Sequence, residues 1–248
     1  MKKAFFFLFV VILFSCDSEN ANDCVQTSGD LVQIDYDITG FNKIIVYERS
    51  QLIVSQGPYE VILETGENLV NDIDITVADA TLSIKNNNSC NLVREYGVTK
   101  VYVTLPDLQV LRNSSGLAVK SSGTLNLNEL TLLCEDTEEE DAFHISGDLD
   151  LDINVDKLSI ETNGLSNFFL NGTVNELDLK FLLGDSRFEG RNLEVQTATV
   201  YHRGTNDIFL QAKQQVTGSL LSTGNLILTE EPPVLNVEEL YTGRVIIE

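Results

Sequence analysis

The chain has 248 residues, 43% of them hydrophobic, and its 16 Lys and Arg stand against 38 Asp and Glu, giving a formal net charge of −22. This length allows one large domain or two small ones, and the apolar content argues against a wholly disordered chain. The negative charge argues against nucleic acid as a partner, because that binding depends on Lys and Arg neutralising phosphate. With two His and one Met, we expect neither a cofactor nor a metal site.

Residues 1–15 are predicted to be a signal peptide. Lys2 and Lys3 precede the apolar run 4–14, and Ser15-Cys16 follow it. Eleven helical residues rise about 16 Å, roughly half of a bilayer core, so a retained membrane-spanning helix is the poorer interpretation. The segment Leu13–Cys16 resembles a bacterial lipobox, although Phe14 is less usual at its place. The resemblance implies cleavage before Cys16 and lipidation of that cysteine; an ordinary signal peptide is the alternative.

Residues 16–27 are predicted to carry the lipid and a flexible tether. The segment Asp17–Asp23 is polar and acidic and has no apolar period. Acidic residues directly after a lipidated cysteine resemble the export signal of surface lipoproteins in Bacteroidetes-type bacteria. We therefore expect an outer-membrane lipoprotein that is displayed on the cell surface.

Three further cysteines would lie in an oxidising compartment, where at most one bridge can form within the chain. Cys134 follows the apolar segment 130–133 and has the surroundings of a small buried residue. Cys24 stands at the start of the domain and Cys90 in a turn-like segment. The sequence therefore predicts a Cys24–Cys90 disulfide, which would stabilise the fold by about 4 kcal/mol.

Residues 28–248 are predicted to form a single all-β domain. Hydrophobic residues alternate with polar ones in short runs separated by Gly, Asn, Asp and Pro, and no window of ten or more residues keeps a helical period. The runs are less regular over 28–105 and more regular over 106–248. The first of them are Ile44–Val46, Leu52–Val54, Val61–Leu63, Ile73–Val77, Leu82–Ile84 and Val101–Val103.

Glycines recur at a nearly constant pitch in the C-terminal half. Gly164, Gly184, Gly204 and Gly224 are 20 residues apart, and Gly243 follows after 19. A unit of this size cannot bury its apolar side alone, but stacked units bury it at a strand spacing of about 4.8 Å. We therefore predict a right-handed parallel β-helix with coils of about 20 residues, in which the glycines serve sharp corners with positive φ. The residues four places after these glycines are Phe168, Phe188, Ile208, Leu228 and Ile247, all apolar.

A β-sandwich is the alternative fold, because two turns in each 20-residue unit would imitate the turn spacing of a sandwich. Alternation sends Phe168 and Phe188 inward, and in a β-helix they would touch in neighbouring coils. The regular pitch of these aromatic residues favours the β-helix.

Several short motifs besides the lipobox are spread over the chain. They are Phe41–Val46, Tyr59–Asn68, Asp79–Ile84, Asn113–Gly116, Gly184–Gly190 and His202–Asp207. Together they resemble the head-GIN-domain family of putative auto-transporter adhesins, common among Bacteroidetes lipoproteins, over most of residues 28–248. The resemblance implies a β-helical fold, a cell-envelope setting and an adhesin role, and it offers no catalytic residue.

The candidate binding residues lie near the few arginines of the repeat region. Coils 20 residues apart would stack three arginines near one another, and this group could bind an anionic sugar or carboxylate. A charge ladder with Glu189 is the plainer interpretation. His202 is more readily a structural histidine than a general base. The candidates are Arg187, Glu189, Arg191, Tyr201, His202 and Arg203.

Two acidic segments could suggest calcium binding or glycan cleavage. For Glu135–Asp141 a solvated insertion is the favoured interpretation, and for Asp148–Ile153 simple strand alternation. We therefore expect a surface-anchored, non-enzymatic β-solenoid that acts as an adhesin or binds an envelope or extracellular glycan or protein. The alternatives are a polysaccharide-degrading β-helix enzyme and a purely structural envelope protein.

Overall fold

The computed structural model describes residues 23–95, 97–137 and 142–248, and this part of the chain is all-β, as the alternation predicts. It contains a single sheet of 17 strands and two short 3₁₀ helices, η1 (Asp23–Val25) and η2 (Glu67–Asp72). None of its helices is long and apolar enough to span a membrane. The predicted signal peptide and Cys16, the predicted lipidation site, lie outside the described residues.

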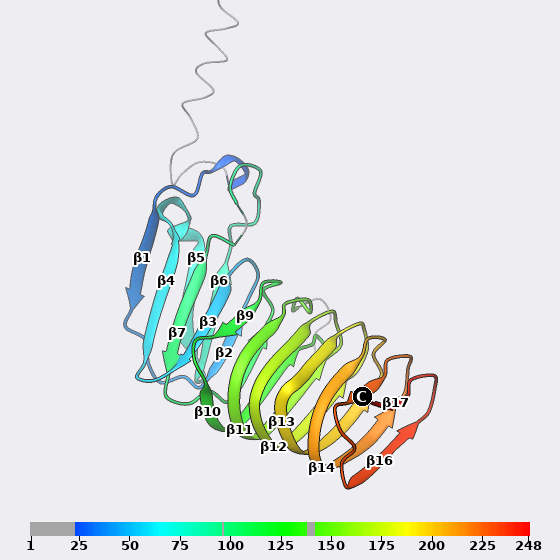
Figure 1. Ribbon diagram of the computed structural model, residues 1–248. Coiled ribbons are helices and arrows are strands. Elements are labelled where there is room, and N and C mark those ends of the chain that lie inside the picture. The colour runs from blue at the N-terminus through cyan, green and yellow to red at the C-terminus, as the bar shows by residue number, and fades with distance from the viewer. Residues whose placement is uncertain (1–22, 96, 138–141) are drawn as a thin grey trace, which may run out of the picture.

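The sheet curls into a half-barrel with two facing walls around one hydrophobic core (Figure 1). The longest strands bend and contribute their first parts to one wall and their later parts to the other. Wall A contains, in order of pairing, β5 (Ile73–Ala78), β6 (Thr81–Asn86), β2 (Lys43–Val46), β8 (Val110–Asn113), the later parts of β10 (Leu125–Cys134), β11 (Leu149–Thr162), β12 (Asn167–Phe181), β13 (Arg187–His202) and β14 (Ile208–Leu220), and then β16 (Val234–Glu239).

Wall B holds the parts of β11 to β14 that precede each bend, together with the shorter strands that pair alongside them. It ends in two short strands that continue the register of β14. Its order of pairing is β1 (Leu31–Tyr36), β4 (Glu60–Gly66), β7 (Lys100–Leu105), β3 (Gln51–Gln56), β9 (Val119–Ser121), the first parts of β11, β12, β13 and β14, then β15 (Leu226–Leu228) and β17 (Val245–Ile247).

From β10 to β14 the neighbouring strands run parallel. Each bent strand with the turn that follows it makes one lap of the chain around the core, and each lap lies against the previous one. Phe168 pairs with Phe188, and Phe188 pairs with Ile208, so residues about one glycine interval apart are neighbours. All three side chains are fully buried. The inward alternation predicted for these residues is therefore present in the structure.

The N-terminal strands correct the expectation of a wholly parallel sheet. β1 pairs antiparallel with β4, β4 with β7, and β5 with β6, so the sheet is mixed. The β5–β6 hairpin turns at Asp79 and Ala80, which both have positive φ. A two-residue turn of this kind usually carries Asn-Gly or Asp-Gly, and without the glycine the hairpin signal is weak in the sequence. The described strands form one sheet, which differs from the two separate sheets of the sandwich alternative.

The repeated glycines allow close approach between laps. A Cβ on Gly224 would lie 2.1 Å from the carbonyl oxygen of Asn206, and one on Gly243 would lie 2.2 Å from that of Gly224. Only Gly184 of the five has a positive φ, +87°. The explanation by positive φ is therefore wrong for the other four. At Gly164, Gly224 and Gly243 the neighbouring segment of chain leaves no room for a side chain.

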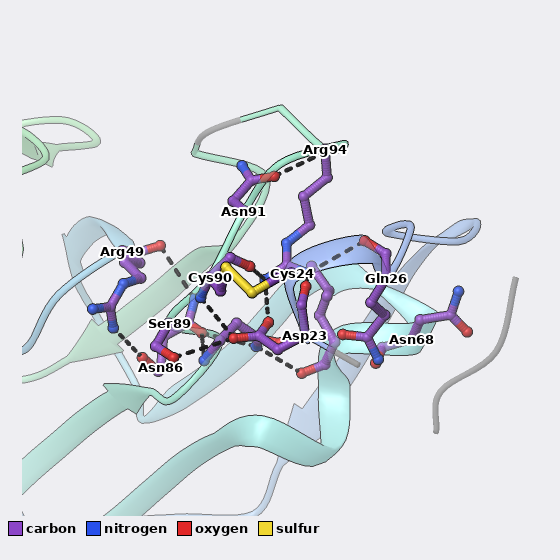
Figure 2. A network of polar contacts seen from close by, with 12 residues as sticks. Asp23, Cys24, Gln26, Arg49, Asn68, Asn86, Ser89, Cys90, Asn91 and Arg94 are labelled. Carbon is purple, nitrogen blue, oxygen red and sulfur yellow. Dashed lines mark hydrogen bonds and ion pairs between the residues drawn. A yellow bond between two sulfur atoms is a disulfide. The ribbon is translucent and has the colours of Figure 1, made fainter. Parts of the chain in front are cut away.

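The start of the described chain is fastened to the loop between β6 and β7 (Figure 2). Cys24 and Cys90 form a disulfide, the pair that the sequence predicts. The Arg94 guanidinium donates to the main-chain oxygens of Asp23, Gln26 and Cys90 and pairs with the Asp23 carboxylate at 2.6 Å. Burial alone would raise the pKa of Asp23, but the hydrogen bonds from Arg94 and Cys90 hold that pKa below its usual range.

Candidate binding face

An apolar row runs along the outer face of wall B. Phe168 and Leu170 are buried in the core, so Phe169 between them faces outward. Register then places Phe169 beside Glu189, and Glu189 beside Phe209. Phe209 lies beside Ile227 of β15, and Ile227 lies beside Ile246 of β17. The outer row therefore carries apolar groups on four of its five strands from β12 to β17.

Two predicted site residues, Arg187 and Arg191, lie over the Phe209 ring. Their guanidinium carbons are 4.2 and 3.6 Å from its centroid, which is cation–π distance, and they leave Phe209 only 6% exposed. Glu189 holds both arginines, accepting from Nε of Arg187 at 2.7 Å and from Arg191 at 2.8 Å. Arg191 also pairs with Glu248 at 2.8 Å. Two cations and two carboxylates therefore form a cluster without net charge.

A β-bulge places Arg191 in this cluster. Phe169 pairs with Glu189 but Asn171 pairs with Asn192, so β13 holds one more residue than β12 over this stretch. The extra length falls at Gly190 and Arg191. A Cβ on Gly190 would lie 2.3 Å from Cε1 of Phe188, so glycine is needed there. Bulges of this kind redirect side chains and are common beside functional sites.

A shallow hollow of about 320 Å³ opens beside the bulge. It is lined by Phe169, Asn171, Glu189, Arg191 and Asn192. Phe169 is 41% exposed and offers an apolar ring face, while the amides, the carboxylate and the guanidinium offer hydrogen-bond donors and acceptors. An apolar face bordered by polar groups of both kinds suits a sugar ring, which has C–H faces and hydroxyl edges.

The other three candidate residues lie at the wall A end of β13, away from this cluster. His202 is fully buried, with its ring edge-on to Phe181 and Nε2 2.9 Å from the carbonyl oxygen of Asn206. Burial lowers the pKa of His202 more than that hydrogen bond and the nearby Asp207 raise it. This position suits a structural histidine. Tyr201 lies on the outer side of wall A and Arg203 is exposed in the following turn, so only two of the three arginines share one ring.

The acidic segments have partners within the fold. Asp148 accepts hydrogen bonds from the backbone and side chain of Asn167 at 2.8 and 2.9 Å, and Asp152 accepts from Asn171 at 3.1 Å. Glu135 is buried against Arg112, with an ion pair at 2.6 Å. Among the described residues, no three His, Cys, Asp or Glu side chains are grouped to hold a metal ion. Strand alternation alone does not mark Phe209 as a candidate, because the bulge that brings Arg191 over its ring is not visible in the sequence.

A family model described as "Putative auto-transporter adhesin, head GIN domain" matches residues 40–232. The fold is similar to a crystal structure of a putative adhesin from Bacteroides fragilis, with a TM-score of 0.79 and 19% identity over 90% of this chain and 99% of that one. It is also similar to a putative adhesin from Parabacteroides merdae, with a TM-score of 0.60 and 14% identity over 88% and 97% of the two chains. No curated protein matches the sequence.

Proposed function

Since the chain belongs to the head GIN domain family of putative auto-transporter adhesins, we propose that it is a non-enzymatic adhesin of the cell surface that binds glycan. In this proposal a lipid on Cys16 holds the chain in the outer membrane. The outer face of wall B then presents the binding site.

We further propose that the laps from β10 to β14 are coils of a right-handed parallel β-helix. Their parallel pairing at about 20 residues per lap supports this description, and crossovers between parallel strands are right-handed in about 98% of cases. Such coils give the long, rigid lateral face that an adhesin needs.

The hollow beside Phe169 is the observation that carries the glycan proposal. Stacking of a sugar ring on Phe169 would supply apolar contact, and Asn171 and Asn192 would supply hydrogen bonds to hydroxyl groups. Because Glu189 and Glu248 already compensate Arg187 and Arg191, the site favours a neutral sugar over an anionic one. The same pairing opposes the enzyme alternative, since Glu189 is held by two arginines and presents no free acid and base pair.

A glycan array tests the proposal directly. The predicted mature chain, residues 16–248, should bind neutral glycans. Phe169→Ala and the double variant Arg187→Ala/Arg191→Ala should each reduce that binding at least tenfold. Val77→Ala, a substitution at an exposed apolar residue of β5, should leave binding unchanged. Absence of any glycan binding, or equal binding by all variants, would contradict the proposal, and turnover of a polysaccharide would overturn the non-enzymatic role.

The anchor and its location need a separate test. Cells fed a labelled fatty acid should incorporate it into the wild-type protein and not into Cys16→Ala. Protease added to intact cells should then cut the wild-type protein. A protein that is cut only after lysis would contradict surface display.

A further inference from the structure

One edge of the half-barrel gathers the loops that follow wall A strands and lead into wall B. We call this edge the rim; it is the upper edge in Figure 1. It includes the described residues 87–95 and 97–99 of the loop between β6 and β7 and the turns 163–166, 182–186, 203–207, 221–225 and 240–244. The opposite edge is formed by the bends within β11 to β14.

Large hydrophobic side chains are exposed at the tips of four of these six rim loops. Each is between 56% and 76% exposed, although the neighbouring turn residues include buried ones that face the core. The turns 203–207 and 221–225 carry none of them. An exposed apolar patch of this kind marks an interaction surface. The side chains are Leu92, Val93, Leu165, Leu183, Leu240 and Tyr241.

The described chain also begins at the rim. The backbone N–H of Leu92 donates to the carbonyl oxygen of Cys24, and Arg94 holds Asp23 beside the same loop. Cys16, the proposed lipid site, precedes Asp23 by seven residues, which extend to at most about 25 Å. An anchored chain therefore keeps the Leu92–Val93 tip close to the bilayer surface.

The charge of the rim turns differs from that of the whole chain. The five turns from 163 to 244 contain two acids, Asp185 and Asp207, and two bases, Arg203 and Arg244, and so carry no net charge, whereas the chain as a whole carries −22. The loop between β10 and β11 also belongs to the rim, and its described residues Glu135 and Phe143 lie against Arg112 on the outer side of wall A. Glu135 pairs with that arginine, and Phe143 stacks on it at 4.2 Å.

We propose that the rim docks on the bilayer that carries the lipid anchor, with its leucines and Tyr241 entering the interface between headgroups and acyl chains. Apolar side chains gain free energy from such burial, tyrosine is enriched at membrane interfaces, and the five turns from 163 to 244 bring no net charge to the bilayer. Docking fixes the orientation of the half-barrel, so that the bends within β11 to β14 face away from the membrane. The inference rests on the lipid anchor in the proposed function.

Tryptophan fluorescence can test this orientation because the chain contains no Trp. Leu183→Trp and Tyr241→Trp place one reporter each on the rim, and Val77→Trp places a control at the far end of β5, near its turn into β6. The predicted mature chain can be coupled through Cys16 to maleimide lipid in phosphatidylcholine vesicles. Cys24 and Cys90 are joined and Cys134 is buried, so Cys16 is the one reactive thiol of that chain.

On coupling, emission from both rim tryptophans should shift to shorter wavelengths and be quenched by brominated lipid, while that from Val77→Trp should not change. Rim tryptophans that behave like the control would overturn the proposal, as would equal quenching of all three. A concentration-dependent shift without vesicles would also overturn it, because a second copy would then cover the rim. Chemical coupling makes the result independent of natural acylation, so failure of the anchor and failure of docking are distinguishable. Leu165→Trp provides a third rim position if either variant fails to fold.

Discussion

Phe168 of β12 lies directly opposite Phe188 of β13, and both side chains are completely buried. This pair joins two laps of the chain through the core, and Phe168 also contacts Phe181 from wall A, with ring centroids 5.9 Å apart. Phe188→Ala should therefore lower the free energy of unfolding by about 3–5 kcal/mol. The measurement is denaturant unfolding followed by circular dichroism.

Phe169→Ala is the matched control for Phe188→Ala, because it removes an outward ring from the position next to Phe168, the partner of Phe188. It should cost about 1 kcal/mol or less while it reduces glycan binding. Equal destabilisation by the two substitutions would contradict the assignment of inner and outer faces.

Gly224→Ala tests the close approach between laps. The added Cβ would meet the Asn206 carbonyl oxygen at 2.1 Å and His202 Nε2 at 2.2 Å, so the laps must move apart. We expect a loss of about 2 kcal/mol or more in the free energy of unfolding. Thr223→Ala, a change at the exposed neighbouring residue, should have little effect. A neutral Gly224→Ala would show that the laps are looser than described.

The regular spacing of the glycines allowed a stack of laps to be predicted from the sequence, because each lap must return to the same corner beside its neighbour. Their steric role could not, since it depends on the distance between Gly224 and the carbonyl of Asn206 in a different lap. The β5–β6 hairpin escaped prediction because Asp79 and Ala80 adopt positive φ without the usual glycine. For the proposed site, the sequence offered Arg187, Glu189 and Arg191 as candidates, but not the Phe209 ring that both arginines contact.

Removing the disulfide should destabilise the N-terminal part most. Cys90→Ser opens a bridge between residues 66 positions apart, and the chain-entropy model gives a loss of about 4 kcal/mol. Arg94 would still hold Asp23 and Gln26, so we expect a folded but less stable protein. Thermal unfolding of Cys90→Ser and of Ser89→Ala, which loses one exposed hydrogen bond, measures the difference. Free thiols at Cys24 and Cys90 in the mature protein would contradict the bridge.

Stability should depend on pH through His202. Burial lowers the pKa of His202 in the folded state, whereas an unfolded histidine titrates near about 6.5. Between those two pKa values the unfolded chain binds more protons, so stability falls as the pH decreases from about 7 through that window. His202→Gln should flatten this part of the profile. If stability changed with pH in the same way above pH 5 in the wild-type protein and in His202→Gln, burial would not be what lowers the pKa of His202.

The adhesion of whole cells tests the central claim most directly. Cells that display equal surface amounts of the wild-type protein, Phe169→Ala or Val77→Ala should be compared on a surface coated with the glycan identified on the array, by counting the cells that remain under flow. The account predicts retention for the wild-type protein and Val77→Ala and its loss for Phe169→Ala. Full retention of Phe169→Ala, or no retention of cells with the wild-type protein, would contradict the claim that the outer face of wall B is the adhesive surface.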